Sequence, residues 1–480
     1  MVFVSSMFIN LLDATIVNVA LPQIGREFGL TSTAIESVSI AFLVSLAVFI
    51  PAAGWLGDRF GAKRVLLTAL AVFTIASVLC GLAQNLEQLV AFRALQGAGG
   101  GMMTPVGMAL LFRVFPPHER VRASAILTIP TALAPALGPV LGGLLVMDLS
   151  WRWVFWVNLP IGVAAFAFGL IALTGESGRR AGRFDLPGFV FCSLGLACFM
   201  YGLSEGPHDG WTSAAVLTTL IGGLVLLVLA VLTELRTENP LVAVRLLGDR
   251  LLRASTLVTV CFTAGFMGTL YAISLYYQDG RGMTPLAAGL SVFPEAIGVM
   301  CGSQLASRLV YPRLGARRTL SIGLTGAVLC MAALALLDAD TNLWIARTEM
   351  FLLGVAVSHV FVTSQAVAFA TIPAQQTGQA STLFNALRQV GGAAGVAVLT
   401  TAMVAAGRPM LSYHWAFAVA AVCTALALGF TQMINESEAR AATQRPDPTA
   451  TGRPDPAATR PAAPDSADPG PAVPESVKIG

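Results

Sequence analysis

Long apolar segments separated by short polar loops follow one another along most of the chain. Each is about 20 residues long, the length of a helix that crosses the hydrocarbon layer of a bilayer. Helices are expected because every backbone amide in lipid must be bonded within the protein. The pattern predicts fourteen membrane-spanning helices, at residues 2–22, 33–57, 64–84, 89–112, 122–147, 153–174, 184–204, 213–233, 253–277, 285–309, 316–337, 343–364, 380–403 and 412–433.

The placement of arginine and lysine tests this count. The loops that follow even-numbered helices hold 17 of these residues, and the loops that follow odd-numbered helices hold 4. Basic residues gather in cytoplasmic loops of membrane proteins. We therefore expect the even-numbered loops and both termini to lie in the cytoplasm, and the chain to lie in the inner (plasma) membrane.

Composition supports the same class of protein. Hydrophobic residues make up 55% of the chain and charged residues 11%, with a mean hydropathy of +0.74. Soluble domains carry about 25% charged residues, so this chain lacks the polar surface that water requires. The expected fold class is an all-α membrane protein whose main partner is the lipid bilayer.

A repeated motif divides the chain into related halves. Gly61-Ala62-Lys63-Arg64 matches Gly315-Ala316-Arg317-Arg318 at an offset of 254 residues. This predicts an N-terminal six-helix bundle at residues 1–175 and a C-terminal one at 251–435. Two inserted helices with their linkers occupy 176–250. The segment 436–480 is rich in Pro, Ala, Asp and Thr, and we expect it to be a disordered cytoplasmic tail.

A charged residue lies deep inside each of two predicted membrane helices of the first half. Asp13 falls in the middle of the first helix and Arg93 within the fourth. Charged groups inside a membrane are costly and usually functional. Asp13 is a candidate proton carrier, with Asn10 on the same helix face. The alternative is that Asp13 and Arg93 form a purely structural ion pair.

Weaker polar signals occur in the second half. Glu295 in the tenth helix is a candidate for binding a cationic substrate or a second proton. Arg388 and Gln389 in the thirteenth helix either line a cavity or bridge neighbouring helices.

Two further segments have a physical role that the sequence suggests. Asp58, Arg59, Lys63 and Arg64 form a tight loop in which the acid can pair with arginine or cap a neighbouring helix. In the fifth helix, Gly138-Pro139 predicts a kink, and small residues there permit close helix packing. The alternative for the loop is that its charges only set the orientation of the chain in the membrane. The alternative for Gly138-Pro139 is an ordinary kink of a membrane helix.

Four stretches follow in order along the first half, at Leu12–Pro22, Gly54–Arg64, Arg93–Gly100 and Ala134–Gly143. Together they resemble the major facilitator superfamily, and more closely its fourteen-helix drug:H+ antiporter family. The last stretch is similar to that family's antiporter motif, with Ala134 where the motif usually has its first glycine. The resemblance covers residues 1–435.

The resemblance implies proton-coupled export of drugs, antibiotics or other amphipathic small molecules by alternating access, with a substrate site between two bundles. It implies proton coupling by Asp13 and Arg93, and gating by Asp58, Arg59, Lys63 and Arg64. Gly138, Pro139, Gly142 and Gly143 correspond to the antiporter motif. The candidates for the substrate cavity are Asn10, Gln96, Glu295, Arg388 and Gln389.

Other classes of protein find little support in the sequence. No GxxxxGK[ST] phosphate loop is present, which argues against ATP drive, and no zinc motif or catalytic constellation is present. We expect no cofactor, no metal, no enzyme activity and no nucleic-acid partner, and a transporter that functions as a monomer. Two alternatives remain: an importer or facilitator of the same fold, and a membrane sensor without transport.

Overall fold

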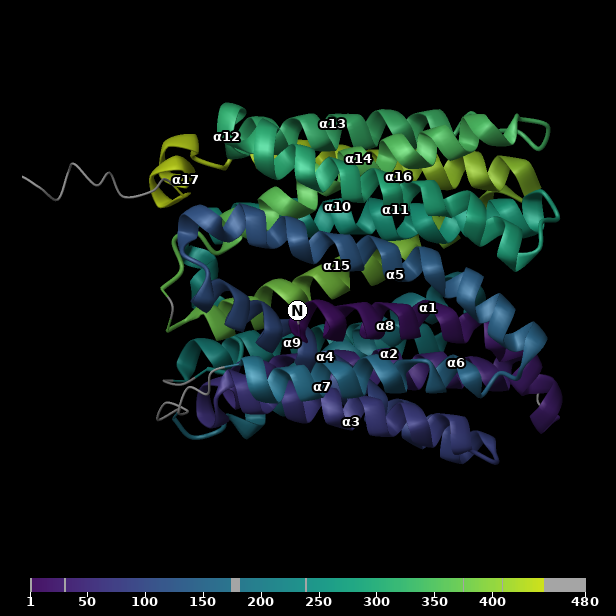
Figure 1. Ribbon diagram of the computed structural model, residues 1–480, viewed down its shortest axis with the longest axis horizontal. Helices are drawn as coiled ribbons and strands as arrows, with labels where there is room; N and C mark the ends of the chain where they lie inside the picture. The colour runs from purple at the N-terminus through teal and green to yellow at the C-terminus, as the bar shows by residue number, and fades with distance from the viewer. Residues whose placement is uncertain are drawn as a thin grey trace, which may run out of the picture. The chain divides into compact units, whose positions relative to one another are not determined.

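A computed structural model of the chain describes residues 2–29, 32–173, 182–237, 240–373, 375–407 and 409–443. This part of the chain is helical, and its long helices run side by side (Figure 1). Those of the first half are α1 (Val2–Phe28), α2 (Ser32–Phe60), α3 (Ala62–Leu82), α4 (Leu86–Val114), α5 (Arg120–Asp148), α6 (Trp153–Trp156) and α7 (Asn158–Ala172).

The remaining elements follow in the same way. They are α8 (Leu186–Asp209), α9 (Ala214–Arg236), α10 (Arg250–Leu275), α11 (Pro285–Leu305), α12 (Tyr311–Leu314), α13 (Ala316–Leu334), α14 (Leu343–Ala368), α15 (Thr377–Ala406), α16 (Pro409–Thr431) and α17 (Glu436–Thr443). Short 3-10 turns occur at Pro117–Glu119 and Val244–Gly248, and single π-turns extend α10 and α11 at Tyr276–Gly280 and Ala306–Val310.

Twelve helices in the described ranges are long and apolar enough to cross a membrane. This confirms a polytopic all-helical membrane protein. The other two predicted spans, 89–112 and 122–147, coincide with α4 and α5, which are 29 residues long each. In α4 the glycines Gly97 and Gly99–Gly101, with Gln96 and Pro105, lower the mean hydropathy. In α5 the apolar helix within the described side chains is the shorter Leu133–Asp148.

Two predicted helix boundaries differ from the structure. The first helix was expected to end at Pro22, but α1 continues to Phe28 with Pro22 inside it. The sixth predicted span, 153–174, is divided at Val157 into α6 and α7. Hydropathy defines the apolar stretch but does not detect a local interruption of the helical hydrogen bonds.

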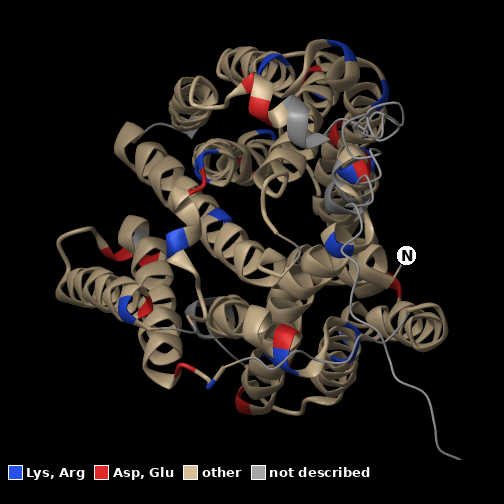
Figure 2. Cartoon of the chain, turned by 90° about the vertical axis from the view of Figure 1, so that its left-hand side faces the viewer, with Lys and Arg blue, Asp and Glu red and all other residues tan. Residues whose placement is uncertain are grey.

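Helix starts are marked by side-chain caps where the sequence supplies Asn, Asp, Ser or Thr. Asn85 accepts a hydrogen bond from Gln88 N at 2.9 Å, and Asp249 accepts one from Leu252 N at 2.8 Å. Charged residues are few among the helices (Figure 2). Charges inside the helical body are therefore exceptions that need a partner.

Contacts between helices follow the two sequence halves. In the first half α2 packs on α4, α3 on α4, and α1 on α5. In the second half α11 packs on α14, and α10 on α15 and α16. The halves meet where α5 contacts α11 and α14, and where α15 contacts α2 and α4.

The helices α8 and α9 pack on each other and contact both halves through α8. This helix lies against α2 and against α15. Ser193 on α8 donates a hydrogen bond to Val48 O on α2 at 2.7 Å, and Trp211 Nε1 donates to Thr401 Oγ1 on α15 at 3.0 Å. The inserted pair therefore touches one helix from each half.

The glycine of the repeated motif has a positive φ angle in both halves. Gly61 and Gly315 have φ angles of 89° and 83°, and each immediately precedes a helix, α3 or α13. Such positive φ values favour glycine because it has no Cβ.

The predicted tail begins later than expected, because residues 436–443 form α17. Glu436 Oε1 and Oε2 accept hydrogen bonds from Ala316 N at 3.1 Å and Arg317 N at 2.8 Å, which caps the start of α13. A carboxylate is favourable at a helix N-terminus, and this contact anchors the segment. Residues 444–480 lie outside the described part of the chain.

Candidate functional site: a buried ion-pair network and a sealed end

Asp13 and Arg93 are brought together in the interior of the first half. Asp13 lies on α1 and is 0% exposed, and Arg93 lies on α4 and is 1% exposed. Arg93 Nη1 forms an ion pair with Asp13 Oδ2. A buried charge requires a partner of this kind, since removing either charge from water is costly.

Neutral side chains complete the coordination of the Asp13 carboxylate. Asp13 Oδ1 accepts hydrogen bonds from Gln96 Nε2 at 2.8 Å and from Asn158 Nδ2 at 2.9 Å. Gln96 Oε1 in turn accepts one from Arg93 Nη1 at 2.9 Å. Asn158 also bonds Ser77 Oγ at 3.1 Å, so the network joins α1, α3, α4 and α7.

Sequence reasoning assigned Gln96 to a substrate cavity and did not identify Asn158 at all. Asn158 begins α7, and its amide donates to Asp13 Oδ1. An Asn next to three tryptophans looks like part of an interfacial belt. The only signal for its role was an uncharged polar residue at the start of an apolar run.

Aromatic rings and a backbone carbonyl surround the guanidinium of Arg93. Its Cζ lies 4.2 Å from the centre of the Phe42 ring and 5.8 Å from that of Phe155. Its Nε donates to Val38 O at 3.3 Å. These contacts bury the guanidinium, and electrostatic interactions in such a low-dielectric interior are stronger than in water.

Small residues on α4 permit this close packing. A Cβ at Gly97 would overlap Phe42 O, and one at Gly101 would overlap Leu46 O, both on α2. Asn10 of α1 donates to Gly100 O at 3.3 Å. Asn10 therefore packs on α4, and no hydrogen bond among the described residues joins it to Asp13.

The Gly138-Pro139 segment of α5 lies between α1 and α11. A Cβ at Gly138 would overlap the hydroxyl oxygen of Thr15, two residues from Asp13. On the other side, a Cβ at Gly289 of α11 would stand 2.9 Å from Pro139 Cβ. Gly142 also faces α1, whereas a Cβ at Gly143 would meet only Leu286 Cβ, at 3.9 Å.

Of the four predicted loop residues, only Asp58 lies where the halves meet. Asp58 Oδ1 accepts a hydrogen bond from Arg113 Nη2 at 2.6 Å, and a Cβ at Gly378 of α15 would stand 3.4 Å from Asp58 Oδ1. Lys63 instead donates to the backbone carbonyls of Leu170, at 2.9 Å, and Leu173. Arg59 and Arg64 are exposed.

The same end of the molecule is closed by contacts between the halves, and we call it the sealed end. It comprises Asp58, Arg113, Phe112, Arg120 and Phe369 with the start of α15. The rings of Phe112 and Phe369 stack at 4.7 Å between centroids, and Arg120 donates to Phe369 O. Ser381 on α15 donates to Pro105 O on α4 at 2.8 Å.

The sealed-end residues Arg113, Arg120 and Phe369 were missed from sequence. The two arginines counted only as cytoplasmic charge, because sequence does not show which basic residue turns inward. Phe369 belongs to a run of apolar residues that offers no distinguishing pattern.

The remaining candidates are not joined to the Asp13 network by any hydrogen bond among the described residues. Glu295 on α11 is buried, and its Oε1 has no hydrogen-bond partner in the described ranges. Arg388 Nη2 donates to Asn385 Oδ1 at 3.2 Å, and Asn385 Nδ2 reaches Met108 Sδ of the first half at 3.5 Å. Gln389 is half-buried beside it.

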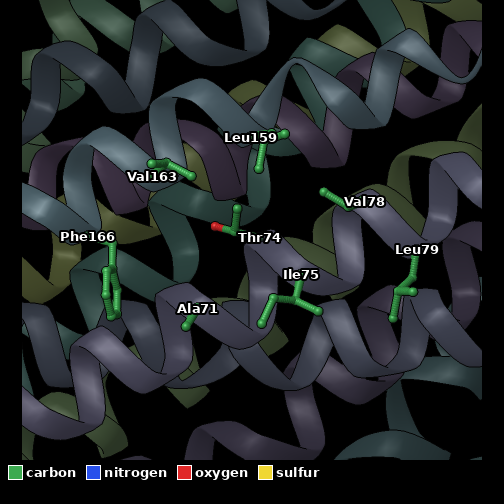
Figure 3. A pocket seen from close by; sticks show the side chains of 9 residues that line it. Ala71, Thr74, Ile75, Val78, Leu79, Leu159, Val163 and Phe166 are labelled. Atoms are coloured by element: carbon green, nitrogen blue, oxygen red, sulfur yellow. The ribbon is translucent and has the colours of Figure 1, made fainter.

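A pocket of about 310 Å³ lies elsewhere, between α3 and α7 (Figure 3). Its lining is apolar apart from Thr74, whose hydroxyl donates to Leu70 O within its own helix. Ile75 and Val163 on its rim are exposed. This pocket has no group that could select a substrate, and we assign it no role. No cluster of potential metal ligands occurs among the described residues.

Comparisons with known proteins agree with this architecture. The chain resembles the human organic anion transporter MFSD10 (TETRAN), with a TM-score of 0.65, 16% identity, and coverage of 90% of this chain and 98% of that one. It resembles a variant of the E. coli fucose:proton symporter FucP with a TM-score of 0.61, 14% identity, and coverage of 90% and 97%. At such identities the likeness concerns the fold alone.

Sequence comparison identifies nearer relatives. The chain is 32% identical over 392 residues to the multidrug resistance protein B homolog of Mycobacterium tuberculosis, covering 81% of this chain and 72% of the relative. It is 32% identical over 406 residues to the tetracenomycin C resistance and export protein of Streptomyces glaucescens, covering 84% and 75%. Residues 3–396 match the sequence profile of the Major Facilitator Superfamily. The chain therefore belongs to the major facilitator superfamily, and its relatives include proteins named for multidrug resistance and antibiotic export.

Proposed function

We propose that this protein is a proton-coupled antiporter that exports drugs, antibiotics or other amphipathic small molecules across the plasma membrane. The observation that carries the proposal is the fully buried Asp13, paired with Arg93 on a neighbouring helix. The names of its relatives support the substrate class. A carboxylate in this position can gain or lose a proton, whereas the arginine stays charged.

Protonation of Asp13 from the outer side would remove the negative charge that holds Arg93. The Asp13 network would then favour a different arrangement of α1 against α4. Because Thr15 of α1 packs on Gly138, and Pro139 packs on Gly289, a shift of α1 reaches α5 and then α11 in the other half. The antiporter motif thus forms a contact path from the proton site to the interface between the halves.

Gating follows from the position of Asp58 beside the start of α15. A carboxylate stabilises a helix N-terminus, and Arg113 holds this one in place. With the Phe112–Phe369 stack, the pair keeps the sealed end closed. Release of substrate to the other side requires this end to be shut, and uptake from the cytoplasm requires it to open.

The topology that suits this mechanism has fourteen spans, with α4 and α5 crossing alongside the twelve apolar helices. Both pack lengthwise on helices that span: α4 on α2 and α3, and α5 on α1 and α11. The sealed end and both termini are then cytoplasmic, as the basic loops indicate. Residues 1–175 and 251–435 act as the two moving bundles of a monomer, with α8 and α9 inserted between them.

The energy available from one proton is adequate for export. One charge that crosses about 100 mV of membrane potential supplies about 2.3 kcal/mol. At about 1.4 kcal/mol per tenfold change in concentration, this supports roughly a 40-fold gradient of a neutral substrate.

Reconstituted vesicles test the proposal, with ethidium and tetracenomycin C as probes. An imposed proton gradient should drive probe movement opposite to the protons in the wild-type protein. Asp13→Asn should abolish this drive, and Asp209→Asn, which changes an exposed acid at the end of α8, should not. Full proton-driven movement in Asp13→Asn would refute the assignment, and movement in the same direction as protons would indicate an importer.

A further inference from the structure

Two buried carboxyl groups stand together at the end of the inserted helix pair, where the mechanism above assigns no role. Asp185 caps the start of α8 and is 8% exposed, and Glu234 lies near the end of α9 and is 2% exposed. Backbone amides contact both carboxyl groups, and the Leu241 amide also lies close to Glu234. Gly188 N donates to Asp185 Oδ1 at 3.0 Å, and Val242 N donates to Glu234 Oε1 at 3.1 Å.

The two carboxyl groups face the same small space. A Cβ at Gly188 would overlap Asp185 Oδ2 and would stand 2.9 Å from Glu234 Oε1. Asp185 Oδ2 and Glu234 Oε2 have no hydrogen-bond partner in the described part of the chain. Two buried oxygens thus lack the partners that such atoms normally have.

Nothing positively charged within the described residues neutralises this pair. Neither carboxylate takes part in an ion pair there. Arg183 and Arg236 are exposed, and Arg245 donates to Leu235 O instead. The groups recorded nearby are uncharged. The Cys192 thiol of α8 interacts with Glu234, the Trp55 ring of α2 packs on Phe184, and the Gln379 amide of α15 donates to Pro240 O.

We propose that Asp185 and Glu234 share a single proton and form a second proton-binding site, on the inserted helices. Two buried negative charges this close, with no cation paired to either among the described residues, strongly disfavour each other. One proton held between Asp185 Oδ2 and the Glu234 carboxylate leaves a single negative charge and gives the unpartnered oxygens a hydrogen bond. Loss of that proton restores the repulsion and separates the start of α8 from the end of α9.

The site is connected to both sides of the sealed end. Phe184, next to Asp185, packs edge-on against Trp55 of α2 at 4.9 Å, three residues before Asp58. Pro240, two residues before the amide that Glu234 binds, accepts a hydrogen bond from Gln379 Nε2 of α15 at 3.2 Å. Separation of α8 from α9 would therefore act on α2 and on α15. This coupling rests on the proposed function, whereas the shared proton does not.

Infrared difference spectroscopy of the full-length protein in lipid nanodiscs tests the shared proton without requiring transport. At neutral pH the wild type should show the carbonyl band of a buried protonated carboxyl group. Glu234→Gln should remove that band, because Asp185 can then ionise alone. Asp185→Asn should weaken the band, because Glu234 loses the neighbouring negative charge but stays buried. Asp209→Asn is the matched control and should keep it.

The result that would overturn the proposal is a band unchanged in both variants, or a wild-type spectrum that lacks it. A band that disappears when sodium or potassium ions are added at fixed pH would show a metal-cation site instead. Because this readout does not involve Asp13, failure of Asp13-dependent transport would leave it intact.

Hydrogen–deuterium exchange measures the consequence for residues 240–247, the linker that follows α9. After correction for the intrinsic pH dependence, protection of residues 240–247 in the wild type should fall at least about tenfold when the shared proton is lost. Glu234→Gln should show no such fall. An equal fall in that variant would separate the linker from the carboxyl pair and contradict the coupling.

Discussion

At the scale of single residues, the Asp13 network shows how a membrane helix accommodates a carboxylate. Its charge is matched by one arginine, and its second oxygen is occupied by two amide groups. The sequence revealed Asp13 and Arg93 because a charge inside an apolar segment is conspicuous. It did not reveal Asn158, since an uncharged side chain at a helix start has many ordinary roles.

A double-mutant cycle tests whether Asp13 and Arg93 stabilise each other in the folded protein. Asp13→Asn leaves Arg93 buried without a counter-charge and should lower the free energy of unfolding by about 3–5 kcal/mol. The double variant with Arg93→Gln should lose less than the sum of the two single variants, because neither charge is then left alone. Denaturation of the purified protein measures this, and strictly additive losses would argue against the pairing.

At the scale of elements, the fifth helix shows what a glycine motif does. Hydropathy predicted where α5 runs, and Gly138-Pro139 suggested close packing. Only the structure shows that its two faces contact different halves, α1 through Gly138 and α11 through Pro139. The predicted function of the motif depends on neighbours that are far away in the sequence, which explains why the sequence alone could not locate it.

Two substitutions in this motif should differ sharply in their effect on stability and on probe export. Gly138→Ala places a methyl group against Thr15 and should destabilise the protein by about 1–3 kcal/mol and lower probe export. Gly143→Ala is the matched control, because its methyl group would meet only Leu286 at 3.9 Å. Thermal unfolding and vesicle transport measure both, and equal effects of the two variants would contradict the packing described for α5.

At the scale of the whole molecule, the halves meet tightly at the sealed end. The repeat motif predicted two related halves, and the loop after α2 was expected to gate between them. Of its four charged residues only Asp58 reaches the other half, because Lys63 turns to the end of α7 and the two arginines turn to the surface. The charge of a loop residue does not show whether its side chain contacts the other half, its own half or the solvent.

Loss of the Asp58 carboxylate should open this end. In a variant whose native cysteines are replaced and whose buried Ser381 is changed to cysteine, Asp58→Asn should speed thiol labelling about fivefold. That factor corresponds to the loss of an interaction of about 1 kcal/mol. Arg59→Gln, in the same loop but exposed, should leave the labelling rate unchanged. Faster labelling in Arg59→Gln alone would assign the gate to another residue.

The proposed export mechanism depends on Asp13 exchanging a proton when substrate binds. The most direct measurement adds a transported probe to the purified protein in weakly buffered solution and records the change in pH. The wild type is expected to release protons, and Asp13→Asn to release none while still binding the probe. Undiminished proton release from Asp13→Asn would contradict the central claim.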